Sequence, residues 1–538
     1  MKKMIRTKRT LSVFYSVSAL LLAACTNLEV EQTDSILSPS FEGIATAEEA
    51  NSSVDAMYNQ LNGYIGDQAN LFALSEVTTD ALLVPTRGSD WGDNGIWRQL
   101  HQHSWTADHA YINNVWNQWN ELQLTASEVL DDRSASSPDA RAQAAFLRAL
   151  GVYVILDNFG QVPFRDTKAS PLDDPEVLTG EAAIAQIVGD LQVAIDGLPA
   201  SAAGSDNPRA TKAAARYLLA KVHLNRHIFN GSGSPDAADM NAVISLVDQI
   251  ESDGYELQDG YFEMFRDTPD TETIWYIRTS VGNRIWNTLH YNLTTPEQAG
   301  GWNGFSTLSE YYDMFEGPAG TNAEGSGQEE RRGFVPSAGL PAGEPGTVDS
   351  NGDGVADGTN IGNGFLFGQQ YGPTGAALTD RSGNTPLSFT REFVSAVDGS
   401  NSLIDNNEIT GIRVIKYNPR YGGFKEHEIF FRYSDAYLMK AEAMMRSGGD
   451  PTAMVNTLRV LRGATPLGTV TESDLLEERG RELYAEFWRR NDMIRFGQFT
   501  RDWEFKDGAA VGNSDRELFP IPASQVILNP NLTQNPGY

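Results

Sequence analysis

Apolar residues recur at three-and-four spacing over several long stretches of the chain, which is the pattern of amphipathic helices. Residues 141–159 carry a broad apolar stripe. Residues 181–198 place Ile184, Ile187, Leu191 and Leu198 on one face, with Thr179 as the expected N-cap. Residues 209–229 and 240–252 repeat the pattern. We therefore predict two successive antiparallel helix pairs.

The C-terminal third has the same periodicity. Residues 431–450 and 451–464 predict a third helix pair, and residues 472–497 predict one further long helix. The pairs are rich in alanine and aromatic residues and resemble tetratricopeptide-type repeats, although the strict consensus of those repeats is absent. The pattern thus predicts a mainly α fold with helical arrays on both sides of the middle of the chain.

The middle differs in composition. Residues 316–406 are dominated by Gly, Pro, Ser, Thr and Asn, and short stretches at 364–367 and 412–417 favour strands. We expect long irregular loops and small β elements on the helical scaffold. Binding sites concentrate in loops that a rigid scaffold holds.

The first residues carry targeting information. A basic segment with five Lys or Arg is followed by an apolar stretch, residues 11–22, that is too short to span a bilayer comfortably. The string LLAAC then resembles a bacterial lipobox that ends at Cys25, the only cysteine of the chain. We expect cleavage after residue 24 and acylation of Cys25, although ordinary secretion with an incidental cysteine remains the alternative.

These features suggest four parts. Residues 1–24 are the expected lipoprotein signal peptide, and residues 25–40 are a lipidated tether. Residues 41–260 form an N-terminal helical region, and residues 261–538 form a second region with a loop-rich middle and C-terminal helices. A length of 538 residues exceeds what one ordinary core holds, in line with two cores or one extended array.

The charge balance narrows the range of ligands. The formal net charge is −30, and residues 1–24 contribute five Lys or Arg without any acidic residue. The processed chain would therefore be still more acidic and would repel nucleic acid. The same field disfavours other polyanionic ligands and favours neutral ones.

Two glycine-framed turns are candidates for sugar recognition, because sugars stack on aromatic rings while short polar side chains bond their hydroxyls. Trp91 lies in the first, TRGSDWGDNG, and Trp302 lies in the second, GGWNG. Turn residues are hard to bury completely, yet Trp91 could also pack back on the scaffold. Helical spacing in INNVWNQWNEL instead predicts that Trp116 and Trp119 belong to the core.

An acidic segment resembles a calcium loop. DSNGDGVADG supplies ligands at positions one, three, five, seven and nine, while position twelve is Asn360 instead of the usual glutamate. The sequence predicts a structural Ca²⁺ site if a further ligand comes from elsewhere, with a solvated acidic turn as the alternative. The expected ligands are Asp349, Asn351, Asp353, Asp357 and the carbonyl of Val355.

Catalytic motifs are missing from the sequence. HLNRH, which holds His223 and His227, lacks the glutamate of HExxH zinc proteases, and neither GxSxG nor a phosphate loop is present. The acidic and basic residues of 477–490 are expected to form a surface and inter-helix ion-pair network rather than a catalytic pair. These motifs indicate no catalytic cofactor, but with 71 acidic residues a catalytic pair of carboxyl groups stays open at this point.

Seven segments in the same order resemble the SusD/RagB-like lipoproteins over essentially the whole processed chain. They are LLAAC, SEVTTDALLVPTRGSDWGDNGIWRQLHQHSW, FLRALGVYVILDNFGQVPF, ATKAAARYLLAKVHL, RYSDAYLMKAEAMMR, ERGRELYAEFWRRNDMIRFG and LFPIPASQVILNPNLTQNPGY. The resemblance implies an α superhelix with irregular loops and a non-catalytic glycan site. It also implies anchoring at the cell surface of the outer membrane, above a SusC-like TonB-dependent porin that receives the glycan.

The resemblance also assigns roles within the two turns. It implies a stacking role for Trp91 and an amide contact for Asn94, with Asp93 and Arg87 as weaker polar contacts. Trp302 and Tyr291 are expected to complete an aromatic arc. Two other functions stay open at this point: a surface glycoside hydrolase, whose two carboxyl groups would flank a cleft, and a peptide-binding adaptor on helical repeats.

Overall fold

A computed structural model of the chain describes residues 40–206, 208–266, 269–280, 287–293, 301–336, 361–372, 375–418 and 426–538. The expected signal peptide, Cys25 and the expected calcium ligands lie outside these residues. Residues 41–169 and 173–538 cluster together as one unit.

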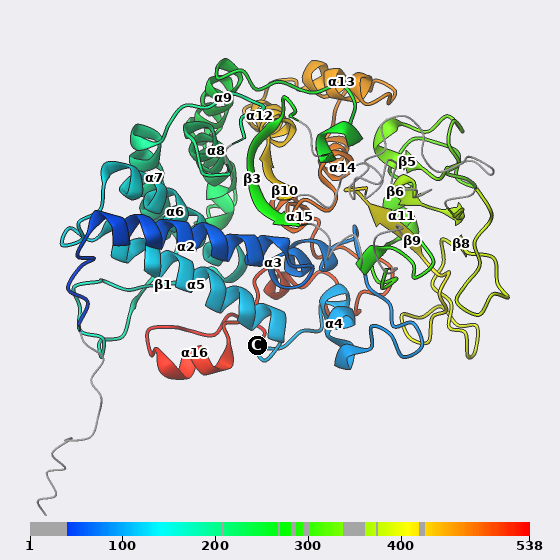
Figure 1. The fold of residues 1–538 in the computed structure, drawn as a ribbon, viewed down its shortest axis with the longest axis horizontal. Coiled ribbons are helices and arrows are strands. Elements are labelled where there is room, and N and C mark those ends of the chain that lie inside the picture. The colour runs from blue at the N-terminus through cyan, green and yellow to red at the C-terminus, as the bar shows by residue number, and fades with distance from the viewer. Residues whose placement is uncertain are drawn as a thin grey trace, which may run out of the picture. The chain divides into compact units, whose positions relative to one another are not determined.

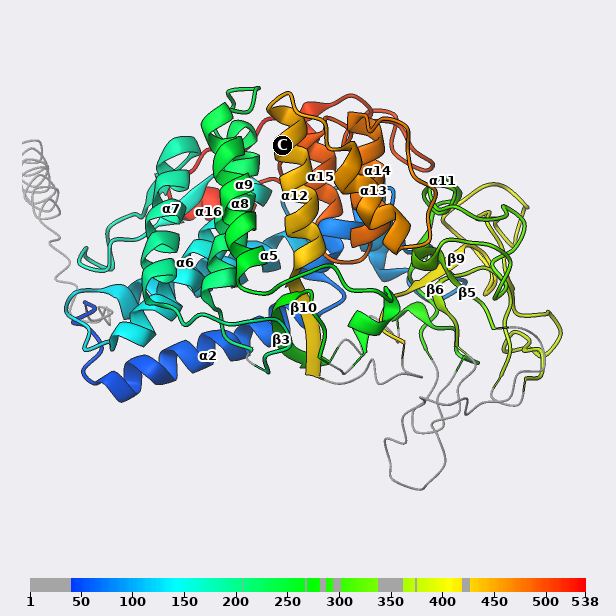
Figure 2. The ribbon, with the colours of Figure 1, turned by 90° about the horizontal axis from the view of Figure 1, so that it is seen from above.

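Helices dominate the first half of the chain, as the periodicity predicts. They are α2 (Ala47–Gly66), α3 (Asn70–Phe72), α4 (Ile96–Gln102), α5 (Ala110–Leu130), α6 (Pro138–Phe159), α7 (Gly180–Gly197), α8 (Lys212–Phe229) and α9 (Ala237–Ser252). From α5 to α9 each helix packs against the next one, and α9 then packs against α12 (Tyr433–Arg446) from the C-terminal part (Figures 1 and 2).

Small residues allow these helices to approach closely. A Cβ atom at Gly151 of α6 would lie 3.1 Å from the carbonyl oxygen of Trp119 in α5, which is tighter than an ordinary contact, so glycine favours the close approach of the two helices. Trp116 and Trp119 are both buried in this interface, which confirms their prediction as core residues. Local signals set the ends of α6, because Ser137 caps its first turn and Gly160 follows with a φ of 70°.

The C-terminal part adds α12, α13 (Thr452–Leu461), α14 (Glu472–Leu483), α15 (Arg489–Arg495) and α16 (Ala523–Leu528), after the short α11 (Ser309–Tyr312). The prediction of one continuous helix over residues 472–497 is wrong. Ala485 and Phe487 have φ values of 57° and 75°, which no right-handed helix contains. The break buries Phe487 and lets its N–H donate to the carboxylate of Glu76 at 2.8 Å.

The strands are short and antiparallel. The structure pairs β1 (Val162–Phe164) with β2 (Glu176–Leu178), β3 (Thr273–Ser280) with β10 (Glu426–Arg432), and β7 (Gly368–Gln369) with β8 (Ser388–Phe389). A four-stranded sheet has the order β4 (Ser306–Thr307), β9 (Ile412–Ile415), β6 (Asn363–Leu366), β5 (Gly333–Phe334). This sheet lies among the loops beside α11 (Figure 1) and confirms the two predicted β-prone stretches.

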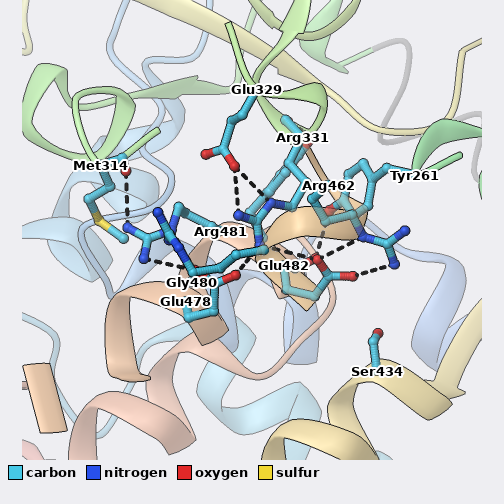
Figure 3. A network of polar contacts seen from close by, with 12 residues as sticks. Tyr261, Met314, Glu329, Arg331, Ser434, Arg462, Glu478, Gly480, Arg481 and Glu482 are labelled. Carbon is cyan, nitrogen blue, oxygen red and sulfur yellow. Dashed lines mark hydrogen bonds and ion pairs between the residues drawn. The ribbon is translucent and has the colours of Figure 1, made fainter. Parts of the chain in front are cut away.

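The predicted ion-pair network joins helices, but most of it is buried rather than at the surface. Glu482 of α14 bonds Arg462 at 3.0 Å and Arg331 at 3.3 Å (Figure 3). It also bonds Arg432 at 2.8 Å. Glu478, one turn earlier, bonds Arg331 at 2.7 Å. Burial would raise the pKa of Glu482, but the three guanidinium groups outweigh it and hold this pKa well below its usual value.

A Glu482→Gln substitution should therefore lower the free energy of unfolding by about 3–5 kcal/mol, because three buried guanidinium groups would lose a shared countercharge. Urea denaturation measures the change. The matched control is Glu477→Gln in the same helix, whose side chain is 45% exposed and should matter by less than about 1 kcal/mol. Equal effects of the two substitutions would contradict this account of the network.

Candidate functional site

The turn around Trp91 is held in an unusual backbone conformation. Trp91, Asp93 and Asn94 have φ values of 60°, 36° and 52°, in the left-handed region that non-glycine residues seldom adopt. The turn runs from the Arg87–Asp90 backbone bridge into α4. Strained backbone of this kind persists only where surrounding contacts enforce it, and such residues cluster at functional sites.

Trp91 is partly buried, so neither of the two sequence-based alternatives describes it completely. One edge of its indole lies on Gly304, where a Cβ would come within 2.5 Å of Cζ2. Its ring also contacts those of Trp97 and Phe305, with centroids 5.7 and 6.3 Å away. The residue as a whole is neither buried nor fully exposed.

The structure brings the second predicted turn directly beside the first. The indole N–H of Trp91 donates to the backbone oxygen of Trp302 at 2.6 Å. The Trp302 side chain itself is 63% exposed, whereas its neighbours Gly301 and Asn303 are buried. Trp91 and Trp302 therefore share one surface, although 211 positions separate them in the chain.

Tyr291 lies at the edge of the same surface. Its hydroxyl donates to the carboxylate of Asp90, the residue before Trp91, and the guanidinium carbon of Arg381 lies 3.7 Å from its ring centroid. Burial and then the bond to Asp90 raise the pKa of Tyr291, so the phenol stays neutral. We call the surface of Trp91, Trp302 and Tyr291 the aromatic platform.

The polar candidates of the turn divide into two groups. Asn94 is exposed, and its amide has no hydrogen-bond partner among the described residues. Asp93 is also exposed, but one of its oxygens accepts from the indole N–H of Trp97 at 3.2 Å. Asn94 is therefore placed to bond a ligand, and Asp93 keeps one oxygen for that purpose.

Arg87 does not fit the predicted role of a direct contact, because it is only 3% exposed. Its guanidinium donates to Asn303 O at 2.7 Å, Asn407 O at 2.9 Å and the hydroxyls of Thr410 and Ser306. The turn composition suggested exposure, but the side chain points inward beneath the platform. Burial lowers the pKa of Arg87 to about 9.

A second buried arginine completes this support. Arg413 of β9 donates to Asn303 Oδ1 and to the backbone oxygen of Glu408, both at 2.8 Å. The sheet register sets Arg413 opposite Ser306, which also bonds Arg87. The two guanidinium groups thus tie the Trp302 turn to the segment 406–413 by bonds that mostly end on backbone oxygens.

Residues that the sequence did not indicate surround the platform. Glu408 accepts from the backbone N–H of Arg381 at 2.9 Å, from its guanidinium, and from Nε2 of the buried His290 at 3.1 Å. Burial would raise the pKa of Glu408, but these donors lower it. Burial lowers the pKa of His290 to about 4, so this ring is neutral and fixed in one tautomer, with Nδ1 accepting from Asn292 N. Only tertiary contacts reveal these partners.

Cavities elsewhere in the described part of the chain are lined by residues outside the platform. One, of about 520 Å³, is lined by Asp80, Glu310, Glu477, Phe496 and Arg501 among others. Another, of about 280 Å³, lies between Asp206, Asp270 and Tyr276. Within the described part of the chain no cluster of three or more His, Cys, Asp or Glu could hold a metal ion.

The fold and the site together define a helical-array protein that displays a shallow aromatic surface built by loops. Comparison with known sequences agrees with this class. Residues 271–538 match the SusD family, and residues 34–224 match a family described as starch-binding associating with outer membrane. The chain belongs to the SusD family, as its seven sequence segments predicted.

Relatives extend the similarity over most of the chain. It is 28% identical over 516 residues to the starch-binding protein SusD of Bacteroides thetaiotaomicron, covering 89% of this chain and 87% of that protein. A SusD-like protein from Bacteroides fragilis superposes with a TM-score of 0.64 at 20% identity, covering 94% and 99% of the two chains. This superposition confirms the predicted SusD-like helical fold.

A further structural neighbour is described as a laminarin binding SusD-like protein, with a TM-score of 0.62, 19% identity, and 92% and 100% of the chains covered. The relatives with a stated role are named as binding proteins. Among the helices of the described residues, none has the length and apolarity needed to cross a membrane.

The contact between Gly304 and Trp91 can be tested. In Gly304→Ala the new methyl group would collide with the indole and with Asn287 O, 2.8 Å away. We expect Trp91 to lose its bond to Trp302 and the free energy of unfolding to fall by about 1–3 kcal/mol. The indole N–H resonance of Trp91 in an NMR spectrum and a urea titration measure both effects.

Gly92→Ala is the matched control for this change. Gly92 lies in the Trp91 turn itself with a φ of −69°, and the nearest atom to its added Cβ would be 3.9 Å away. It should leave both the resonance and the stability unchanged. An unshifted Trp91 signal in Gly304→Ala would contradict the packing described above.

Proposed function

We propose that this protein is a non-catalytic, lipid-anchored glycan-binding protein of the outer-membrane surface. It captures a neutral polysaccharide or oligosaccharide on the aromatic platform and delivers it to a SusC-like TonB-dependent transporter. Cys25 carries the anchor in this proposal, and residues 25–40 are the tether. The observation that carries the proposal is the strongly exposed indole of Trp302 beside Trp91 and the unpartnered amide of Asn94.

The arrangement suits sugar recognition for physical reasons. A large indole that stays exposed in water retains apolar area that a sugar ring can cover, and the amide beside it can bond hydroxyls. Buried guanidinium groups hold the turns, so little conformational entropy is lost on binding. The names of relatives that bind starch or laminarin support the same ligand class.

Because the contact is shallow and involves few rings, we expect a dissociation constant of about 1 μM or larger. This corresponds to a binding free energy of about −8 kcal/mol or weaker. Anchoring at a membrane and repeated units along a polymer raise the effective concentration and compensate for this weakness. Weak binding also allows release to the transporter without a large barrier.

Trp302→Ala should weaken glycan binding by about 10-fold or more, since truncating a central aromatic contact typically costs about 2 kcal/mol. The melting temperature should not change, because the side chain is exposed. Affinity electrophoresis in gels with laminarin or starch, together with calorimetry, measures binding. Ile527→Ala, which removes an 83% exposed apolar side chain on α16, is the control and should bind like the wild type.

The same incubations should release no new reducing ends, as expected for a binding protein. Oligosaccharide release would favour the glycoside hydrolase alternative. Wild-type binding that persists unchanged in Trp302→Ala would remove the platform from the proposal.

A structural calcium ion in the segment Asp349–Asp357 is a separate part of the proposal, argued from its ligand spacing alone. Calcium at 100 times its dissociation constant should stabilise the fold by about 2.7 kcal/mol, and EDTA should reverse the effect. Thermal melting measures the shift, and Asp353→Ala should abolish it. If neither calcium nor EDTA shifts the melting temperature of the wild type, the segment is a solvated turn.

A further inference from the structure

Tyr291 is enclosed by charged groups that belong to three separate segments. Asp90 comes from the Trp91 turn, Arg381 from the turn 380–383, and Glu408 from the segment before β9. Arg381 bonds both carboxylates, with Nη2 lying 3.0 Å from Asp90 and Nε bonded to Glu408. We call Asp90, Arg381 and Glu408 the clasp.

The contact with Arg381 of the clasp limits how the Tyr291 ring can contact a ligand. The Arg381 guanidinium carbon lies 3.7 Å from the centroid of the Tyr291 ring, so it covers one ring face in a cation–π contact. A sugar cannot stack on a face that is already covered. On that face Tyr291 supports Arg381, and the outer side of the guanidinium takes the place of the ring.

Arg381 is exposed and has donors left over. Its side chain is 47% exposed, compared with 31% for Asp90 and 19% for Glu408. Nε and Nη2 are bonded, but Nη1 has no hydrogen-bond partner among the described residues. The guanidinium bonds Asp90, the residue directly before Trp91, and therefore lies beside the Trp91 turn.

The two carboxylates also change the chemistry of the arginine. A guanidinium that carboxylates already compensate attracts a free anion less than an unpaired one does. It still presents N–H groups in a fixed plane, and two such donors match adjacent hydroxyls of a sugar ring. The arrangement favours hydrogen bonding to neutral hydroxyl groups over binding of carboxylates or sulfates.

We propose that Arg381 is a specificity-determining contact of the platform, which donates hydrogen bonds from its guanidinium to neighbouring hydroxyls of a neutral sugar. This inference rests on the proposed glycan-binding function and adds to it a residue, a chemical role and a ligand preference. Glu408 is a positioning residue, because it reaches the ligand only through Arg381.

Variants of Arg381 test the inference with laminarihexaose and maltohexaose as probes. Arg381→Gln should weaken binding of the sugar that the wild type prefers by about 10- to 100-fold, the range for a hydrogen bond to a charged group. Arg381→Lys should recover only part of the loss, since a lysine is a point donor without the planar fork. The control is Arg278→Gln, which removes an arginine that is 46% exposed and bonded to Asp206 at 3.1 Å.

Deoxy analogues of the bound sugar separate direct contact from a structural effect. The wild type should prefer the parent sugar to at least one monodeoxy analogue by about 10-fold, and Arg381→Gln should lose this preference. A purely structural role would weaken parent and analogue equally and would overturn the inference. Tighter binding of laminarihexaose by Arg381→Gln would also overturn it, because Arg381 would then only cover Tyr291.

The outcomes separate the two proposals. Binding that is lost in Trp302→Ala but unchanged in Arg381→Gln overturns this inference and leaves the glycan-binding function standing. A wild-type protein that binds neither probe nor any other polysaccharide overturns both. Binding of a uronic or sulfated hexasaccharide with higher affinity and strong salt dependence contradicts the neutral preference.

Discussion

Buried guanidinium–carboxylate contacts hold the C-terminal helices to the rest of the molecule. Glu482 alone joins α14 to the end of β10, to the segment after α13 and to Arg331 before β5. Removing these charges from water is costly, and the cost is met only when every partner is in place. Arrangements with a shifted helix would leave a charge unpaired in the interior. The network therefore favours a single packing of the C-terminal helices, and the loops are attached to helices held in that packing.

A series of contacting aromatic rings connects the C-terminal helices to the platform. Phe487, in the break between α14 and α15, contacts Phe72 at 5.4 Å between centroids, and Phe72 contacts Phe305 at 5.8 Å. Phe305 in turn lies 6.3 Å from Trp91. The break in the predicted helix is thus what allows the core to reach the binding surface. From below, Arg87 and Arg413 fix the Trp302 turn to β9.

The sequence predicts those features that depend on local pattern. Periodicity identified the helices, and glycine-framed turns identified Trp91 and Trp302, because both signals lie within a few neighbouring residues. The inward orientation of the Arg87 side chain and the helix break at Ala485 depend on partners far away in the chain. The sequence therefore did not predict them. Arg381 and Glu408 had no signal at all, since 291 positions separate Arg381 from Asp90. For platform residues, composition indicates where a turn is, and tertiary contacts decide which side chains face the solvent.

The polar rim of the platform comes from loops that bear little of the fold's stability. The turn with Arg381 is closed by its own short-range bonds, with Asp380 accepting from Ser382, Asn384 and Thr385. Sequence changes in this loop would therefore alter the hydrogen-bond donors at the rim while the indole surface and the interior stay as they are.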